Sequence, residues 1–313
     1  MRRRVGIIGT GWVGASVAMS TLQSGAVDEL LLHDRNDDLA EGEAMDLAHG
    51  ASFYPSATVR AVALDAVLEA NVIVVSAGRG GGASESRLAL LRDNAAIVRS
   101  IGERLRNFAG IVVMVTNPVD VLTQVMVDAS GLPPARVIGT GTMLDTARLR
   151  QLVGAVLGLD PRSVHAHVVG EHGDSEVVLW NAARAGGVPL RRWSRWSRSH
   201  EPELARRIRD AAYEIIRRKG STNHAIGLAT AELLRCMLRD ERRVLTVSRV
   251  QAGAPEWSGV ALSLPTVVGG EGAVEVLEPE MSDEERHALT RSAAVLRSAF
   301  DGLRAVPDEP STA

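Results

Sequence analysis

The sequence contains almost no cysteine. Among its 313 residues there is one, Cys236, and it stands in the helix-like run "GLATAELLRCMLRD". A single thiol provides neither a disulfide framework nor a cysteine-rich metal site. We therefore expect no metal centre, and a reducing, cytoplasmic location fits the composition.

The chain also lacks a strong charge of either sign and a long apolar run. Its net charge is −3 and its pI is near 6.3, so its bulk electrostatics predict neither binding to nucleic acid nor to an anionic membrane. No apolar stretch is long enough to cross a bilayer, and the glycines of the opening "RVGIIGTGWVG" do not suit a signal helix. We expect no nucleic-acid or membrane partner, only small molecules and other subunits.

Short apolar runs alternate with helical runs through the first half of the chain. "RVGIIG" precedes a helix expected from Val13 to about Ser24, then come "DELLLHD", "NVIVVSAG", a helix from Ser84 to about Asn107, "GIVVMVTNP" and "RVIGTG". Near-continuous apolar strands of this kind indicate a parallel sheet covered on both faces. The pattern predicts an α/β fold, a Rossmann-type doubly wound parallel sheet over residues 1–141.

Mixed helical and strand-like runs follow this first domain. They include "LDTARLRQLVGAVLG", "HAHVVGEHG", helices near 201–219 and 222–239, three β-rich segments, and a closing helix from Ser282 to about Leu303. We expect an α+β substrate domain over residues 142–313. The segment "RRWSRWSRSHEPE", residues 191–203, carries alternating arginine, tryptophan and serine, and we expect a surface or subunit-interface segment there.

A glycine motif follows the first strand directly and opens a helix. "GTGWVG" supplies Gly9, Gly11 and Gly14, and the second strand ends about 20 residues later at Asp34. Glycines at these places permit a tight turn and let backbone N–H groups approach a pyrophosphate, and a carboxylate at the second position binds a ribose 2′-hydroxyl and repels a 2′-phosphate. A mere strand–helix turn is the alternative. The motif predicts NAD rather than NADP, although Arg35 is a neighbouring cation.

Two further segments hold residues suited to acid–base chemistry. His172, in "VVGEHGDSE", lies between glycines at the end of an apolar strand, and Asp145 lies three residues before Arg148 in "LDTARLR". On one helical face, such a carboxylate could orient an imidazole while the guanidinium binds a substrate carboxylate. A structural histidine and a helix cap with a surface ion pair are the alternatives.

Five motifs together resemble the L-lactate/malate dehydrogenase family, nearer its lactate branch. They are "GTGWVG", "TNPVDVLT", "VIGTGTMLDTARLR", "GEHGDSE" and "KGSTNHAIGLA", and the resemblance runs through almost the whole chain. It implies reduction of a 2-oxo acid by NADH to an L-2-hydroxy acid, which needs a hydride, a proton, a cation at the carbonyl oxygen and an anchor for the carboxylate.

The resemblance also assigns roles to individual residues. His172 is implied as the general acid/base, Asp145 as the group that orients it, and Arg148 as the anchor of the substrate carboxylate. Asn117, in "TNPVD", would hydrogen-bond near the carbonyl and the cofactor, and Thr222, in "KGST", would line the pocket.

A glycine-rich stretch, "AGRGGGASESR", takes the place of the family's mobile lid. Arg87 then corresponds to the arginine that polarises the carbonyl, and Gly81 falls where lactate enzymes present glutamine and malate enzymes arginine. Because Gly81 offers no side chain, we expect a widened range of 2-oxo acids. Arg79 is a rival that would favour oxaloacetate if the lid bends differently.

The resemblance extends to regulation and assembly. Arg150 and His165 match the basic residue and the histidine that bind fructose 1,6-bisphosphate at a subunit interface in some bacterial lactate dehydrogenases, although an interface salt link or exposed charges would look the same. A homotetramer is expected, with a dimer as the alternative. Malate dehydrogenase activity, and a catalytically silent NAD-binding sensor or structural subunit, are the other functions considered.

Overall fold

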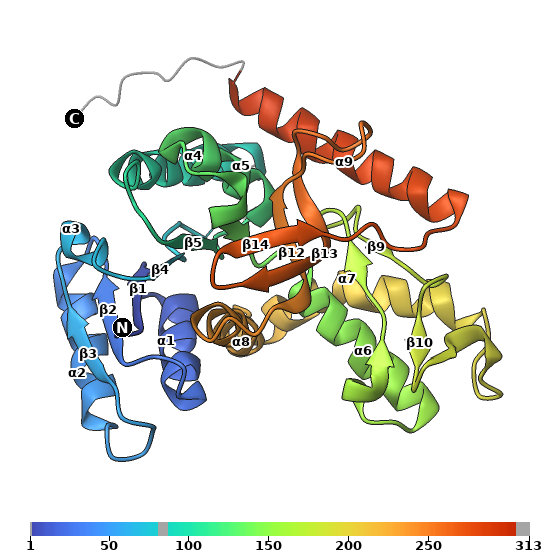
Figure 1. The fold of residues 1–313 in the computed structure, drawn as a ribbon, viewed down its shortest axis with the longest axis horizontal. Coiled ribbons are helices and arrows are strands. Elements are labelled where there is room, and N and C mark those ends of the chain that lie inside the picture. The colour runs from blue at the N-terminus through green and yellow to red at the C-terminus, as the bar shows by residue number, and fades with distance from the viewer. Residues whose placement is uncertain (1, 81–86, 305–313) are drawn as a thin grey trace.

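The computed structural model describes residues 2–80 and 87–304 (Figure 1). Strands and helices alternate through the first half, as the sequence pattern predicts. In chain order the elements are β1 (Arg4–Ile8), α1 (Trp12–Ser24), β2 (Glu29–His33), α2 (Asp37–His49), β3 (Thr58–Ala61), α3 (Leu64–Val67), β4 (Val72–Val75), α4 (Arg87–Arg104), β5 (Ile111–Met114), α5 (Val119–Ser130), η1 (Pro134–Arg136) and β6 (Val137–Gly139).

The second half begins with a long helix and ends with another. Its elements are α6 (Met143–Leu157), η2 (Pro161–Ser163), β7 (Val164–His165), β8 (Val168–Val169), β9 (Val177–Val178), β10 (Arg184–Ala185), β11 (Val188–Pro189), η3 (Leu190–Arg192), α7 (His200–Lys219), α8 (His224–Leu238), β12 (Arg243–Val250), β13 (Ala261–Gly269), β14 (Gly272–Val276) and α9 (Asp283–Arg304). The predicted bounds of α1 and α9 each agree with the structure to within one residue.

One large sheet runs through the molecule. Its strand order is β14-β13-β12-β6-β5-β4-β1-β2-β3, and the six strands from β6 to β3 pair in parallel. This is the doubly wound arrangement. From β1 the chain adds β2 and β3 on one side and then returns to add β4, β5 and β6 on the other, which leaves a crevice between β1 and β4 at the carboxyl ends of the strands. Figure 1 shows the first strands at one end of the sheet and β12–β14 nearer the centre of the molecule.

The three C-terminal strands extend this sheet instead of forming a sheet of their own. Ser248 of β12 pairs antiparallel with Gly139 of β6, and β13 and β14 add further antiparallel strands. The sequence pattern assigned these strands to the second domain and did not predict the continuation.

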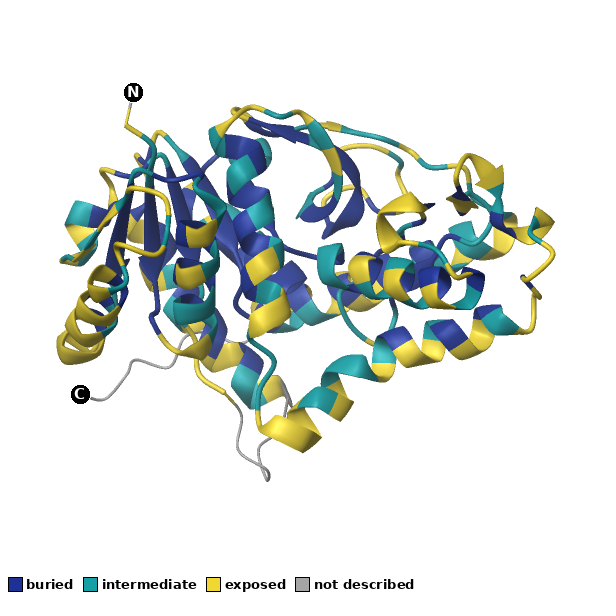
Figure 2. Cartoon of the chain, turned by 90° about the horizontal axis from the view of Figure 1, so that it is seen from below, coloured by how far each residue is buried: buried dark blue, intermediate teal, exposed yellow. Residues whose placement is uncertain are grey.

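Both faces of the sheet are covered, because its central strands are apolar at nearly every position. Leu30 and Leu32 of β2 belong to a buried cluster that also holds side chains of α1, α2 and α8. Leu31 between them belongs to the cluster on the other face, with side chains of α3, α4, α5 and α9. Figure 2 shows the buried strands in dark blue, with helices exposing only their outer sides. A third, smaller core joins α6 and α7 to the short strands β7, β8 and β10.

The tryptophan-rich segment 191–203 belongs to this third core. Trp196 is buried against Trp180, with 5.8 Å between ring centroids, and Arg191 donates two hydrogen bonds to Glu201. Arg192, Arg195 and Arg198 stay exposed. The segment is therefore a packed surface turn. Within the described ranges, no helix has the length and apolarity needed to span a membrane.

Candidate active site

The loop between β1 and α1 is shaped by its glycines. Gly9 has a φ of +95°, and a Cβ there would lie 2.5 Å from the backbone nitrogen of Ala77. A Cβ on Gly14 would lie 1.9 Å from the carbonyl oxygen of Gly9. Both positions exclude a side chain, so the tight turn and the close packing of α1 depend on glycine.

Gly11 differs from the other two glycines because a Cβ there would meet nothing within 4 Å. It is the N-cap of α1, and neither a capping side chain nor an acidic residue in the first turn occupies that helix end. Asp34, at the end of β2, accepts a hydrogen bond of 2.8 Å from the backbone N–H of Thr10. Free space, an uncapped helix N-terminus and a carboxylate thus meet where a dinucleotide would be held, and the loop fits NAD.

His172, Asp145 and Arg148 lie together, although they come from two distant segments. Asp145 lies in the first turn of α6, and its Oδ2 is 2.5 Å from Nδ1 of His172. Its Oδ1 accepts a hydrogen bond of 2.7 Å from Arg148. The exposed fraction of the side chain is 2% for Asp145 but 24% for His172 and 15% for Arg148. A buried carboxylate therefore holds two cationic side chains that reach toward solvent.

This geometry sets the charge state of the imidazole. Burial disfavours the imidazolium, but the carboxylate of Asp145 outweighs it through charge and hydrogen bonding, and the pKa of His172 rises to about 9. The pKa of Asp145 is lowered: burial opposes this, and His172 and Arg148 cause it. At neutral pH the site thus holds a carboxylate, an imidazolium and a guanidinium, and Nε2 of the imidazolium is the nitrogen not bonded to Asp145.

Asp120 is a further residue that supports the histidine, and the sequence analysis did not single it out. It is buried in α5, and its Oδ2 accepts a hydrogen bond of 2.7 Å from the backbone N–H of His172. Burial raises the pKa of Asp120 to about 6, against the opposing effect of that N–H. An acidic residue within the apolar run of α5 was the signal available in the sequence.

For the other predicted site residues that the structure describes, no hydrogen bond to His172, Asp145 or Arg148 is found. Asn117 is exposed at the end of β5, next to the cis peptide bond to Pro118, and its side chain accepts from the N–H of Val119. Thr222 is half-buried between α7 and α8, and within the described structure no hydrogen bond joins it to the histidine cluster. Arg79, the rival lid cation, is ion-paired with Asp93 of α4.

The lid itself is described only at its edges. Gly81 lies outside the described residues. Arg87 begins α4, but its side chain is outside them too.

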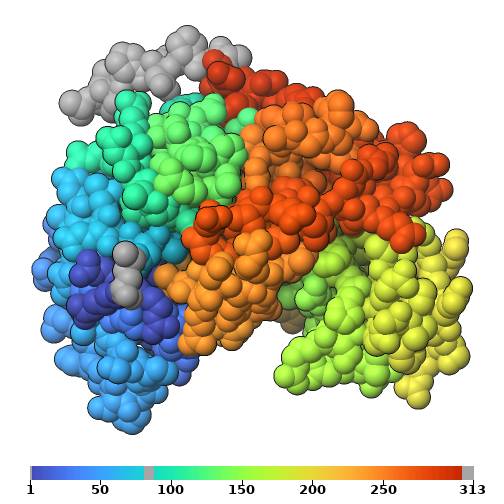
Figure 3. Space-filling model, viewed as in Figure 1, coloured from blue at the N-terminus to red at the C-terminus, as the bar shows by residue number. Residues whose placement is uncertain are grey.

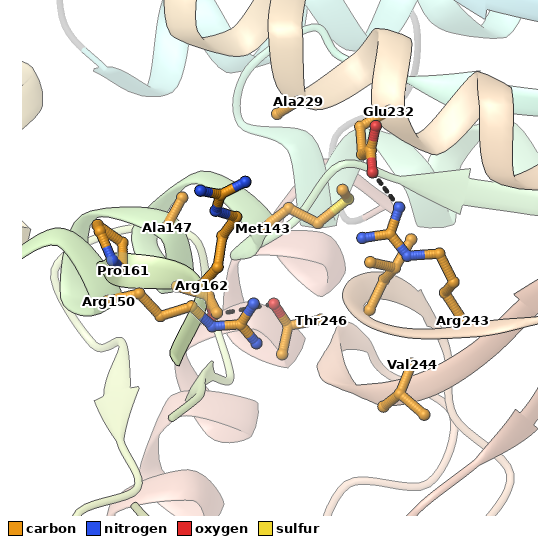
Figure 4. A pocket seen from close by; sticks show the side chains of 12 residues that line it. Met143, Ala147, Arg150, Pro161, Arg162, Ala229, Glu232, Arg243, Val244 and Thr246 are labelled. Atoms are coloured by element: carbon orange, nitrogen blue, oxygen red, sulfur yellow. Dashed lines mark hydrogen bonds and ion pairs between the residues drawn. The ribbon is translucent and has the colours of Figure 1, made fainter. Parts of the chain in front are cut away.

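Arg150 lines a cavity of about 250 Å³ between α6, η2, α8 and β12. It enters with Arg162 from one side, and Arg243, paired with Glu232, faces them (Figure 4). In Figure 3 a notch separates the light green segment of α6 from the orange strands. Burial, and the charge of Arg243, lower the pKa of Arg150.

His165 is exposed on β7. Nε of Arg150 donates to the carbonyl of Ala166, 3.3 Å away. Burial, Arg150 and His165 together lower the pKa of the neighbouring His167 to about 4. The predicted effector residues are therefore close neighbours in a locally basic region.

Comparison with known proteins covers nearly the whole chain. The family model of the lactate/malate dehydrogenase NAD binding domain matches residues 3–139, and that of the alpha/beta C-terminal domain matches residues 142–305. The chain belongs to the lactate/malate dehydrogenase family.

Individual members of this family are closely similar to the chain. The L-lactate dehydrogenase of Salinibacter ruber is 47% identical over 305 residues, which are 95% of this chain and 96% of that protein. The L-lactate dehydrogenase of Synechococcus sp. is 42% identical over 301 residues, 95% of this chain and 98% of that protein. The structure of the minor L-lactate dehydrogenase from Enterococcus mundtii, in its ligands-bound form, has a TM-score of 0.94 at 36% identity and covers 97% of this chain and 99% of that one.

These matches confirm the family, the Rossmann-type fold and the NAD-binding domain that were predicted from the sequence. The chain is an NAD-dependent oxidoreductase. Among the described residues, no group of three or more histidine, cysteine or acidic side chains could hold a metal ion.

Proposed function

We propose that this protein is an L-lactate dehydrogenase-like L-2-hydroxyacid dehydrogenase, which interconverts a 2-oxo acid and an L-2-hydroxy acid. The observation that carries the proposal is the arrangement of His172, Asp145 and Arg148 around one buried carboxylate. A proton donor and a carboxylate anchor, held at a fixed distance from each other, match a substrate whose carbonyl group is next to its carboxylate.

Each residue has a defined part in the proposed reaction. Bound NADH supplies the hydride for the carbonyl carbon. His172 donates its Nε2 proton to the carbonyl oxygen as that oxygen gains charge, and Asp145 stabilises the imidazolium and fixes its orientation. Arg148 binds the substrate carboxylate, and Arg87 supplies the cation at the carbonyl oxygen. Asn117 and Thr222 line the pocket, and Gly9, Gly11, Gly14 and Asp34 hold the cofactor.

Gly81 is proposed to widen the substrate range. A glycine at the specificity position of the lid cannot contact a substrate side chain, so acids larger than pyruvate would be accepted. Malate dehydrogenase activity is the weaker candidate, since the Arg79 side chain is paired with Asp93 and the three family members compared above are L-lactate dehydrogenases.

Further proposals concern the regulation, the assembly and the location of the protein. Arg150 and His165 are proposed to bind fructose 1,6-bisphosphate, which the clustering of cationic groups around His167 supports. A homotetramer, or at least a homodimer, is supported by exposed apolar side chains on α1, α2 and α8. The division into residues 1–141 and 142–313 and a cytoplasmic location complete the proposal; the single, buried cysteine suits a reducing compartment.

One experiment tests the activity, its specificity and its regulation. NADH oxidation is measured with pyruvate, oxaloacetate, and branched and aromatic 2-oxo acids, each with and without fructose 1,6-bisphosphate. We expect turnover of pyruvate and of larger acids, little with oxaloacetate, and activation by the bisphosphate. The matched variant His172→Gln should lose about 10²–10⁴-fold in kcat and still bind NADH. Binding of NADH without any turnover by the wild type would favour the sensor function instead.

A further inference from the structure

Glu176 is a buried acidic residue beside the site, and the proposed reaction gives it no part. It directly precedes β9, and 8% of the residue is exposed. Its backbone N–H donates to the carbonyl of Gly173, which closes the turn that directly follows His172. The turn next to the histidine thus carries a carboxyl group into the interior.

Hydrogen bonding does not account for the burial of the Glu176 side chain. Its Oε1 is buried and has no hydrogen-bond partner among residues 2–80 and 87–304. Nε of Arg209, on α7, is likewise buried without a partner in that part of the chain. A buried polar atom left unpaired is costly, so a carboxyl group serving packing alone would be better replaced by an apolar side chain.

The charges that act on Glu176 come from three segments. Asp145 and Arg148 act from α6, His172 from the turn before β9, and Arg209 from α7. Burial is the largest effect and, together with the charge of Asp145, raises the pKa of Glu176 to about 8; the three cations oppose it. The carboxyl group is therefore mainly neutral at pH 7 and ionises in the mildly alkaline range.

Ionisation of Glu176 changes the charge that a substrate meets. Arg148, His172 and Arg209 are the cations and Asp145 the anion whose charges act at this position, and an anionic substrate bound to Arg148 would meet the same charges. A second carboxylate inside this cluster lowers its net positive charge by one unit and attracts the same cations. Binding of an anionic substrate should therefore respond to the protonation of Glu176.

We propose that Glu176 is a positioning residue for substrate binding: its neutral carboxyl group leaves Arg148 and His172 available to the substrate carboxylate, and its ionised form competes for them. The inference rests on the proposed function, because it assumes a 2-oxo acid as the anion that binds.

The test compares the wild type with Glu176→Gln, which has the same shape and stays neutral. Affinity for oxamate, an unreactive anionic analogue of a 2-oxo acid, is measured calorimetrically on the NADH complex from pH 6.5 to pH 9. We expect equal affinities at pH 6.5. At pH 8.5 the wild type should bind about threefold to tenfold more weakly than the variant. Glu29→Gln, which removes a buried glutamate at the amino end of β2, is the matched control and should follow the wild type.

A second measurement needs neither cofactor nor substrate. The imidazole of His172 is titrated by NMR in both proteins, its signal assigned by its loss in His172→Gln. Loss of the nearby anion should move the midpoint to lower pH in Glu176→Gln. A shifted midpoint without any oxamate binding would show that Glu176 acts on His172, but it would overturn the proposed function and, with it, the role of Glu176 in substrate binding. Parallel oxamate profiles, or an unchanged midpoint, would overturn the inference.

Discussion

Both carboxylate oxygens of Asp145 are in use, one by Arg148 and one by His172. Because the carboxylate is buried, neither cation can turn away without leaving one of its oxygens unpaired, which costs free energy. The imidazole and the guanidinium are thereby fixed relative to each other before a substrate arrives. The same carboxylate raises the pKa of His172, so orientation and protonation share one cause.

The first prediction at the residue scale concerns Asp145→Asn. The carboxylate is what overcomes the effect of burial on His172, so without it the pKa of the imidazole should fall from about 9 to below its ordinary value. Reduction needs the protonated histidine. Up to about pH 9 the wild-type kcat/KM for the 2-oxo acid should thus fall by no more than the about threefold to tenfold proposed for Glu176, and it should decline steeply above that pH. The variant should decline steeply from below pH 6.5.

Initial rates across pH 5.5–10 give the two profiles. In the direction of hydroxy-acid oxidation, which needs the neutral histidine, the wild-type rate should instead rise up to about pH 9. A variant profile that still breaks near pH 9 would show that Asp145 does not set this pKa.

Single residues also show what the sequence could predict. His172, Asp145 and Arg148 were identified by motif, and the structure brings all three together. Asp120 and Glu176 were not, because their importance comes from burial and from the groups around them, which neither residue type nor spacing reveals. The role of Gly81 stays a prediction from the sequence.

At the scale of elements, the junction between β1 and α1 contains glycines of two kinds: two that the packing of the loop requires and one that it does not. Gly9 and Gly14 are required by the packing of the loop itself, since a Cβ at either would overlap backbone atoms. No described residue requires glycine at position 11, since a Cβ there would meet none of their atoms within 4 Å. The missing side chain leaves room for a ligand at the start of α1.

Two substitutions distinguish these two kinds of glycine. Gly11→Ala should leave the melting temperature within a few degrees of the wild type and weaken NADH binding by about tenfold or more, because the added methyl group enters the space of the pyrophosphate. Gly14→Ala should destabilise the fold by roughly 1–3 kcal/mol or more, because its Cβ cannot fit beside Gly9. Thermal melts and fluorescence titration with NADH measure both effects. Wild-type NADH affinity in Gly11→Ala would remove the loop from the cofactor site.

At the scale of the whole molecule, the sheet shows where sequence patterns stop being informative. Five of the six parallel strands were predicted because each is a short apolar run next to a helix in the chain. The sixth, β3, was not predicted, because its sequence "TVRA" is only partly apolar and half-exposed. The pairing of β12 with β6 joins Ser248 to Gly139, which are far apart in sequence. Periodicity identifies a strand but not its distant partner, so the continuation of one sheet across both halves could only be seen in the structure.

Several large apolar side chains are exposed together on one face of the molecule. Trp12, Met19 and Leu228 line a depression of about 780 Å³ between α1, α2 and α8, and their exposed fractions are 66%, 50% and 65%. A contiguous exposed apolar patch of this kind marks an interaction surface. We propose this depression as the subunit contact of the homo-oligomer.

The last prediction is that Met19→Glu combined with Leu228→Glu disrupts this assembly. Four carboxylates would be buried for each pair of joined subunits, at a cost that apolar contacts in the same patch cannot offset. Sedimentation velocity of the wild type should give a mass four times that of one 33.3 kDa chain, or twice it if the assembly is a dimer, and the double variant should give a smaller mass. Phe53→Glu is the matched control: this side chain is 84% exposed but does not line the depression, so its replacement should leave the mass unchanged. A double variant that keeps the wild-type mass would place the subunit contacts on another face.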